Sequence, residues 1–416
     1  MKILIFSHES LFPIFGGHRE YLNEFLNALV TDGHECTMIS WGPENDYSIN
    51  QNRLKIVHFN TDSSAKKSAF KPRQVNYSSS LSYLASRLGA SQYLALKYNS
   101  PDMKIWNILE KLNGFDLILK SGPNASRLPL TLSLRSGTPF IERLDWFGLP
   151  RTLANRGEWL AYLGEKIFFD KIVEKGIVSL FDHTIKKKEL SLVGSRNVYV
   201  ASRADYEEIK LLNQDLNMDY IFPFLSDIED NREVDENDSE KFCLYFASKT
   251  FSSLISVKFL DKIAKQNDGL KIKITGDFED HKAMYNRPNL QILGKLSDVE
   301  FTDYLKKARF VVFPTIEGHG VQMRLIRALS FGKAIIATSA ICSSFTGLID
   351  GKHIIIRDTP QEFESAMREM NADESLRNAL SRNAKRYFLT ELNRENSMRR
   401  FYGMVERAKQ QTLAYC

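Results

Sequence analysis

Long apolar runs, paired cysteines and metal-ligand spacings are all missing from this 416-residue sequence. No run approaches the roughly 18 apolar residues of a membrane-spanning helix, and the apolar stretch of the opening MKILIFSHES is too short for a signal peptide. The four cysteines are widely separated, with no CxxC motif and no paired histidines. They indicate reduced cytosolic thiols and exclude a disulfide framework or a zinc site.

Signatures of nucleic-acid binding, such as zinc knuckles or a basic and aromatic repeat, are also missing, so nucleic acid ranks last among the partners. What is present is the makeup of a soluble globular protein, with 43% apolar and 26% charged residues. A chain of 416 residues is too long for one ordinary core, which favours two domains.

The charge is unevenly distributed along the chain. Residues 227–240 hold eight acids and one arginine, a local charge of −7, which leaves +12 on the rest because the total is +5. The acidic run has almost no apolar residues, so we expect an exposed linker between two domains, over 223–241. The basic remainder suits anionic partners such as nucleotide phosphates or acidic lipid.

Strand and helix periodicities alternate on both sides of this linker. A strand over 2–7, a glycine-containing loop, a helix over 18–31 and a strand over 35–41 open the chain, and the same alternation restarts at 242. This order predicts an α/β fold with two doubly wound parallel sheets facing a cleft. We assign 1–222 and 242–385 to the two domains, with a C-terminal helix over 386–416 packing back across them.

The stretch from Val311 to Thr338 carries a candidate binding loop. An apolar strand ends at a loop with Glu317 and the Gly-His-Gly triplet 318–320, a helix runs to Phe331, and a second strand follows Gly332. Such a crossover makes the strands parallel, and ligands bind beyond their carboxyl ends. The helix N-terminus favours anions such as phosphate. An ordinary turn would explain this unit equally well when it is taken alone.

The segment 155–175 is amphipathic, with Trp159 and Phe168 on its apolar face and several lysines on the other. A basic helix with aromatic residues can lie on a membrane surface. The commoner use is packing against its own domain, which we favour.

Several motifs resemble those of the GT-B glycosyltransferases, specifically the large retaining family-four group (glycosyl transferases group 1). In the first domain the similar segment is GGHREYLNEFLNALVTDGHECTMIS. In the second domain the similar segments are NLQILGKLSDVEFTDYLKKARFVVFPTIEGHG and RALSFGKAIIAT. Their order and spacing are more specific than any one of them.

The resemblance implies an enzyme that moves a sugar from a nucleotide diphosphate to a hydroxyl acceptor with retention of configuration. We expect it in the cytosol, and the basic, aromatic segment 155–175 suggests contact with the inner membrane face. The acceptor would be a carbohydrate or a lipid-linked sugar, as in surface polysaccharide or glycoconjugate synthesis. No cofactor beyond the donor is implied. We expect no essential metal, because cationic side chains would neutralise the departing diphosphate.

The resemblance also assigns the catalytic side chains. Lys249 and Arg324 would stabilise the departing diphosphate, and Glu317 would face the reacting sugar. Asp145, at the end of a first-domain strand, is a candidate to orient or deprotonate the acceptor hydroxyl, although a buried capping aspartate is the commoner role.

The donor-binding residues are mostly glycines. Gly16 and Gly17 would approach the donor diphosphate or the acceptor, and Gly318, His319 and Gly320 would offer backbone N–H groups. The family's second acid, which holds the nucleotide ribose, falls on Arg327, ten residues after Glu317 instead of eight. Arg327 would therefore meet a phosphate or a carboxylate-bearing sugar nucleotide.

Two other functions stay open from the sequence. A GT-B-shaped sugar-nucleotide epimerase would need acids and histidines able to work on the sugar ring, and only Glu317 and His319 stand out. A non-catalytic GT-B partner or binding subunit is favoured by the arginine at position 327, and it would show no turnover with any donor.

Overall fold

The computed structural model describes residues 1–7, 17–42, 47–60, 114–121, 128–144, 151–153, 155–164, 183–184, 186–187, 190, 193, 195–225, 241–248, 250–318 and 320–413. The chain forms two compact units. The first comprises Met1–Leu149, Ile172–Pro223 and Arg394–Cys416, and the second comprises Pro150–Lys171 and Phe224–Asn393. The chain therefore passes between the units four times.

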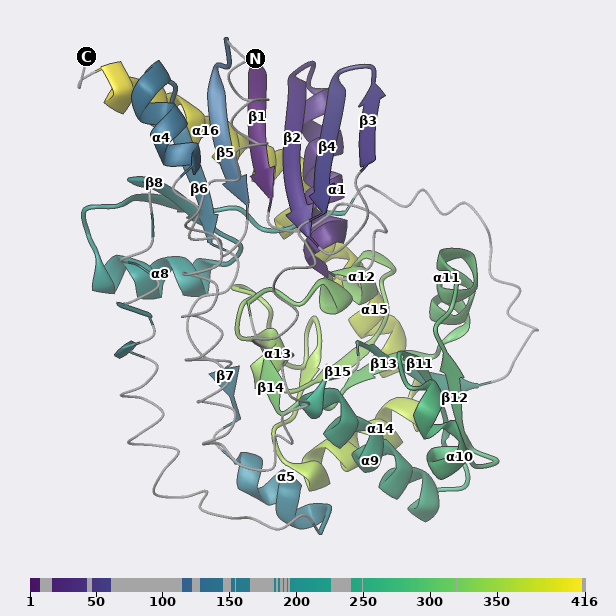
Figure 1. The fold of residues 1–416 in the computed structure, drawn as a ribbon. Coiled ribbons are helices and arrows are strands. Elements are labelled where there is room, and N and C mark those ends of the chain that lie inside the picture. The colour runs from purple at the N-terminus through teal and green to yellow at the C-terminus, as the bar shows by residue number, and fades with distance from the viewer. Residues whose placement is uncertain are drawn as a thin grey trace, which may run out of the picture. The chain divides into compact units, whose positions relative to one another are not determined.

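The first unit is built on a sheet of eight strands in the order β3-β4-β2-β1-β5-β6-β8-β9 (Figure 1). All neighbours are parallel except β3 and β4, which are antiparallel. The strands are β1 (Lys2–Ser7), β2 (Glu35–Gly42), β3 (Tyr47–Gln51), β4 (Leu54–Asn60), β5 (Leu117–Ser121), β6 (Phe140–Leu144), β8 (Asn197–Val200) and β9 (Asn217–Tyr220).

Helices cover both faces of this sheet, which explains why its central strands are buried and largely apolar. On one face lie α1 (Gly17–Thr31) and α16 (Arg394–Leu413), whose Phe25 and Phe401 rings meet edge to face at 5.0 Å. On the other lie α4 (Leu128–Ser136), packed on Leu4 and Phe6, and α8 (Arg203–Leu212). The sheet is thus doubly wound, as predicted.

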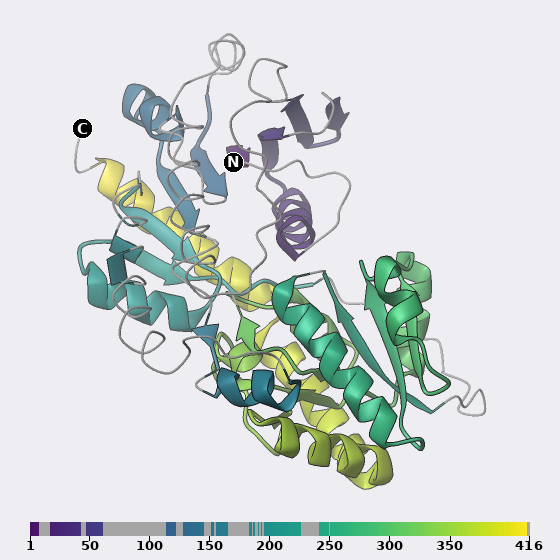
Figure 2. The same cartoon turned by 60° about the horizontal axis from the view of Figure 1, so that its bottom comes forward.

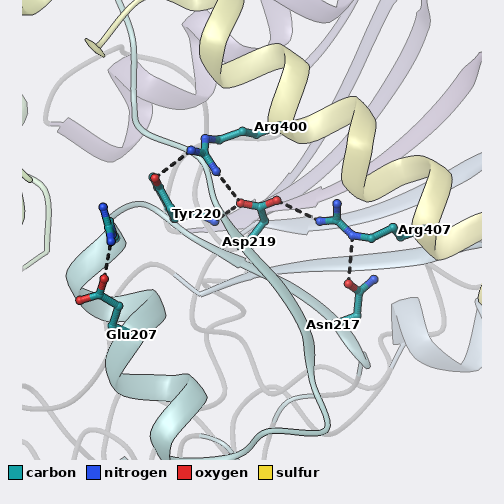
Figure 3. A network of polar contacts seen from close by, with 7 residues as sticks. Glu207, Asn217, Asp219, Tyr220, Arg400 and Arg407 are labelled. Carbon is teal, nitrogen blue, oxygen red and sulfur yellow. Dashed lines mark hydrogen bonds and ion pairs between the residues drawn. The ribbon is translucent and has the colours of Figure 1, made fainter.

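The C-terminal helix α16 is held to the edge strand β9 by a polar network (Figure 3). Asp219 accepts hydrogen bonds from Arg400 at 3.1 Å and from Arg407 at 2.9 Å. Arg400 also donates to the Tyr220 hydroxyl, and Arg407 to Asn217. These contacts explain why the last helix belongs to the first unit although the second unit precedes it in the chain.

The second unit holds a parallel sheet of six strands in the order β12-β11-β10-β13-β15-β16. The chain begins at the central β10, adds β11 and β12 on one side, and then crosses to β13 on the other. The strands are β10 (Phe242–Ala247), β11 (Lys271–Gly276), β12 (Leu290–Gly294), β13 (Phe310–Phe313), β15 (Ile335–Ala337) and β16 (Ile355–Ile356).

Three helices lie side by side on one face of the second unit (Figure 2): α5 (Arg156–Tyr162), α9 (Phe251–Gln266) and α14 (Pro360–Ala372). Trp159 of α5 is fully buried, with its ring 4.8 Å from Phe259 and 5.9 Å from Phe363. Its indole N–H donates to the carbonyl of Asp358. The apolar face of the predicted amphipathic segment therefore packs on its own unit at Trp159.

The other face carries α11 (Asp298–Lys307), α12 (Met323–Ser330) and α15 (Glu374–Glu391) (Figure 1). Ser297 caps α11 in a reciprocal pair with Glu300. Among the described residues, α13 (Ser339–Cys342), α10 (Lys282–Tyr285) and a 3₁₀ turn (Glu279–His281) complete the helices of this unit. A separate antiparallel pair joins β7 (Arg151–Thr152) to β14 (Glu317–Gly318).

The structure places two of the predicted boundaries differently. Residues 150–171 were assigned to the first domain but lie in the second unit, because Trp159 fills its core and β7 pairs with β14. The last predicted helix starts at Arg394 instead of 386, since α15 continues to Glu391.

Most of the predicted linker, 226–240, lies outside the described residues. Among the helices that the structure describes, none is long and apolar enough to span a membrane.

Candidate functional site

The candidate site lies where the sheet of the second unit changes its winding direction. Strands β10 and β13 are neighbours, and their connections leave in opposite directions. Beyond their carboxyl ends lie the turn into α9 and the loop from Thr315 to Gly318. Open α/β sheets bind ligands at this point. In the sequence, Lys249 lies between β10 and α9 and His319 directly follows Gly318; both lie outside the described residues.

The backbone around β14 is fixed from three directions. The Glu317 amide donates to Ser252 Oγ of α9 at 3.3 Å, and the strand pairs with β7. At Gly318, an added Cβ would lie 2.2 Å from the carbonyl oxygen of Ala340 in α13. Only glycine permits this approach. The sequence analysis assigned Gly318 to donor binding. The structure shows that close packing against Ala340 also requires a glycine at this position.

Glu317 makes an ion pair that the sequence did not predict. Its Oε1 lies 3.2 Å from Nη1 of Arg156 in α5, and each side chain is 15% exposed. Burial raises the pKa of the Glu317 carboxyl above its ordinary value, and Arg156 opposes this rise. The sequence spacing gave no signal for this ion pair, because 161 positions separate the two residues. They meet because β7 pairs with β14 and α5 packs on the second unit.

Arg324 and Arg327 project from α12 over a cluster of three phenylalanine rings. The guanidinium of Arg324 lies 5.4 Å from the ring of Phe313, and that of Arg327 lies 5.5 Å from the ring of Phe301. Both rings pack against Phe246 at the end of β10. The structure therefore brings Arg324 and Arg327 together beside the switch point, on one face of their helix.

Arg324 is further fixed by a hydrogen bond. Its Nη2 donates to the hydroxyl of the buried Thr315 at 3.2 Å, at the end of β13. Its Nε is buried and has no hydrogen-bond partner among the described residues. Buried donors without a partner are uncommon in native proteins, so this N–H marks the surroundings of Arg324 as a place where a ligand group could complete the hydrogen bonding.

The helix that carries these arginines begins and ends in defined ways. Its N-cap residue, Gln322, makes no side-chain capping bond, so the first N–H groups of α12 lack that partner. Gly320, two residues earlier, has a φ of +44° and its carbonyl accepts from Ser344 at 2.7 Å. Gly332 ends the helix at a φ of +60°, with the amide bonding pattern of a Schellman motif, as its position predicted.

This arrangement suits a ligand with one anionic and one hydroxylated part. Two guanidinium groups and a helix N-terminus supply positive potential. The carboxylate of Glu317 supplies an acceptor for hydroxyl groups in a site of low exposure.

In the first unit, the predicted site residues are only partly described. Gly17 starts α1 directly after the loop that follows β1, while Gly16 and Asp145 lie outside the described residues. The carboxyl ends of this sheet carry a buried polar row that the sequence reasoning missed. It contains Ser40, Ser7, Ser121 and Arg143 at matching register positions on β2, β1, β5 and β6.

Arg143 is the charged member of this row. It is 5% exposed, and its guanidinium lies 3.9 Å from the ring centroid of Tyr21 in α1. One strand position earlier, Lys120 and Glu142 form a buried ion pair between β5 and β6. The sequence contained a signal for this row, because several mostly apolar strands carry a polar residue at or near their carboxyl ends.

The fold is that of the GT-B glycosyltransferases, with two Rossmann-like units. The family model described as glycosyl transferases group 1 matches residues 249–373, which include this edge. The resemblance stated from the sequence motifs is thereby confirmed. No curated protein matches the sequence significantly.

Solved structures give the same fold over the whole chain. A sucrose-phosphate synthase from Thermosynechococcus elongatus superposes with a TM-score of 0.61 at 13% identity, with all of both chains covered. WaaG, a glycosyltransferase involved in lipopolysaccharide biosynthesis, gives 0.56 at 12%, covering 99% of each chain. Anabaena HepE in complex with UDP-glucose gives 0.53 at 11%, covering 99% of this chain and 98% of HepE.

Proposed function

We propose that this protein is a glycosyltransferase that moves a sugar from a nucleotide diphosphate to a hydroxyl acceptor. The observation that carries the proposal is the pair of guanidinium groups, Arg324 and Arg327, beside the switch point between β10 and β13. A nucleotide diphosphate is the dianionic ligand that fits two adjacent arginines and a helix N-terminus. The family match over this segment and the UDP-glucose bound by HepE support the same donor class.

In this mechanism the cations act on the leaving group. As the bond between the anomeric carbon and the diphosphate breaks, negative charge grows on the phosphate oxygens, and Arg324 and Arg327 stabilise it. Lys249, in the turn after β10, is the third cation that we assign to this role. These groups would allow transfer without an essential metal, and no other cofactor is needed.

The sugar would lie on the Glu317 side of the site. Its hydroxyl groups can donate to the carboxylate, and we assign the backbone N–H groups of Gly318, His319 and Gly320 as further donors to the sugar or phosphate. We infer retention of configuration, with the departing phosphate accepting the proton of the acceptor hydroxyl on the same face of the sugar. The family resemblance supports this stereochemistry.

The acceptor would be bound by the first unit. Gly16, Gly17 and Asp145 are the residues we assign there, and the buried row that includes Arg143 lies at the matching edge of its sheet. A carbohydrate or lipid-linked acceptor in surface polysaccharide or glycoconjugate synthesis fits the role of WaaG in lipopolysaccharide biosynthesis. We place the protein in the cytosol and propose that it contacts the inner membrane face, which binding to liposomes of anionic lipid would test.

The deciding experiment is a donor screen for release of nucleoside diphosphate, with wild type, Lys249→Ala and Arg324→Ala. We expect release from the wild type with one donor and a loss of about 100-fold or more in either variant, as for removal of one stabilising donor group. Wild-type binding without release would favour a non-catalytic subunit. An altered sugar on an intact nucleotide would favour an epimerase. Unchanged release in both variants would remove the diphosphate assignment.

A further inference from the structure

The ion pair between Arg156 and Glu317 connects the donor site to a segment that leaves the first unit. Residues 150–171 lie between two parts of the first unit in the chain, yet they fold into the second. They carry β7, which pairs with β14, and α5, whose Arg156 reaches Glu317. The segment therefore contacts the site through both backbone and side chain.

The position of Arg156 is strongly determined by its neighbours. The side chain of Asn155 donates to the Asp358 carbonyl at 2.7 Å, and the buried Trp159 donates to the same carbonyl. The amide of Leu153 donates to the carbonyl of Ile316 at 3.1 Å. With bonds on both sides, the start of α5 has little freedom to move relative to β14.

An ionised carboxylate beside a diphosphate site raises an electrostatic problem. Glu317 alone would repel the phosphates and would tend to protonate in its buried surroundings. A cation within 4 Å offsets both effects. Arg156 leaves one oxygen of Glu317 for other contacts, because the ion pair uses Oε1.

We propose that Arg156 is a positioning residue that keeps Glu317 ionised and aims its second oxygen at a hydroxyl group of the donor sugar. The inference rests on the proposed transfer reaction. In it, Arg156 does not touch the substrate; it acts through Glu317. Recognition of the donor sugar then depends on Arg156. In the sequence, this residue lies between two segments of the first unit.

The test compares Arg156→Ala, Arg156→Lys and Glu317→Gln, with Glu158→Gln, on the exposed face of the same helix, as the matched control. We expect kcat with the best donor to fall about tenfold or more at pH 7 in Arg156→Ala, the size expected for a hydrogen bond to a charged group. The acidic limb of its pH profile should move to higher pH. Arg156→Lys should keep the wild-type limb, and Glu158→Gln should match the wild type.

The double variant Arg156→Ala/Glu317→Gln separates positioning from a general loss of structure. If Arg156 acts through Glu317, the double variant has the kcat of Glu317→Gln alone. A further loss in the double variant, or a limb that does not move in Arg156→Ala, overturns the inference.

Failure of the proposed function is recognised separately, because the wild type would then release no nucleoside diphosphate from any donor. In that case the thermal unfolding midpoints of the wild type, Arg156→Ala, Glu317→Gln and the double variant still measure the coupling between the two side chains. Additive shifts would show that Arg156 and Glu317 are not coupled, and the inference would fall.

Discussion

At the scale of single residues, Gly318 shows how closely the site backbone is packed. A methyl group there would collide with the Ala340 carbonyl, which is backbone and cannot rotate away. Gly157, on α5, has no atom within 4 Å of an added Cβ. The two glycines therefore form a matched pair for testing whether packing explains the glycine of the motif.

We predict that Gly318→Ala lowers the free energy of unfolding by about 2 kcal/mol, as is usual for overpacking. Gly157→Ala should leave it unchanged or raise it by up to about 1 kcal/mol, because alanine is the better helix former. Urea denaturation followed by circular dichroism measures both. Equal effects of the two substitutions would contradict the packing argument.

Glu317 also predicts a pH dependence of stability. Burial raises its folded-state pKa above 4.5, so the native protein holds this proton at pH values where the unfolded chain has lost it. The contribution of Glu317 to stability is therefore largest at low pH and declines as pH rises from about 4.5 through the folded-state pKa.

Glu317→Gln removes this titration. The stability of the variant relative to the wild type should rise over that pH interval and then level off. Unfolding midpoints between pH 4 and pH 8 measure the difference, with Glu158→Gln as the exposed control. A constant difference across the interval would show that the carboxyl group is not perturbed.

At the scale of elements, Asp219 determines how the last helix is attached. It is 18% exposed and binds two arginines of α16, which is a more favourable geometry than a lone surface pair (Figure 3). The ion pair between Arg203 and Glu207 in the same unit is a matched contrast, because both of its side chains are more than half exposed.

Asp219→Asn should therefore cost roughly 1–2 kcal/mol, since it weakens two charge-assisted hydrogen bonds. The loss should appear as faster hydrogen exchange in α16. Arg203→Ala should leave the exchange of α16 unchanged. If Asp219→Asn also leaves it unchanged, the apolar contacts of Phe401 hold the helix without help from the network.

At the scale of the whole molecule, ligand binding should stabilise one unit selectively. The proposed donor site lies in the second unit, so a nucleoside diphosphate at 100 times its Kd should add about 2.7 kcal/mol to the stability of that unit. Calorimetry with and without UDP measures this. Arg324→Ala should lose most of the shift, whereas Arg203→Ala should keep it. A shift of equal size in both variants would place the ligand elsewhere.

The sequence by itself determined the α/β class, most elements and the order of the two sheets. Apolar strands alternating with amphipathic helices permit few other solutions, and β1 lies at the residues predicted for it, 2–7. It also singled out the loop from Glu317 to Gly320, and the resemblance to the GT-B glycosyltransferases added the two arginines of α12, because motifs within one βαβ unit are local information.

Only the tertiary structure decided what those residues meet. No pattern could place Arg156 against Glu317, because the contact depends on a two-residue strand pairing between distant segments. The stacking of Arg324 and Arg327 on Phe313 and Phe301 likewise arises from the packing of α11 and α12 on neighbouring strands. Local periodicity specifies which residues form strands and helices, whereas long-range packing specifies the partners of each charged group.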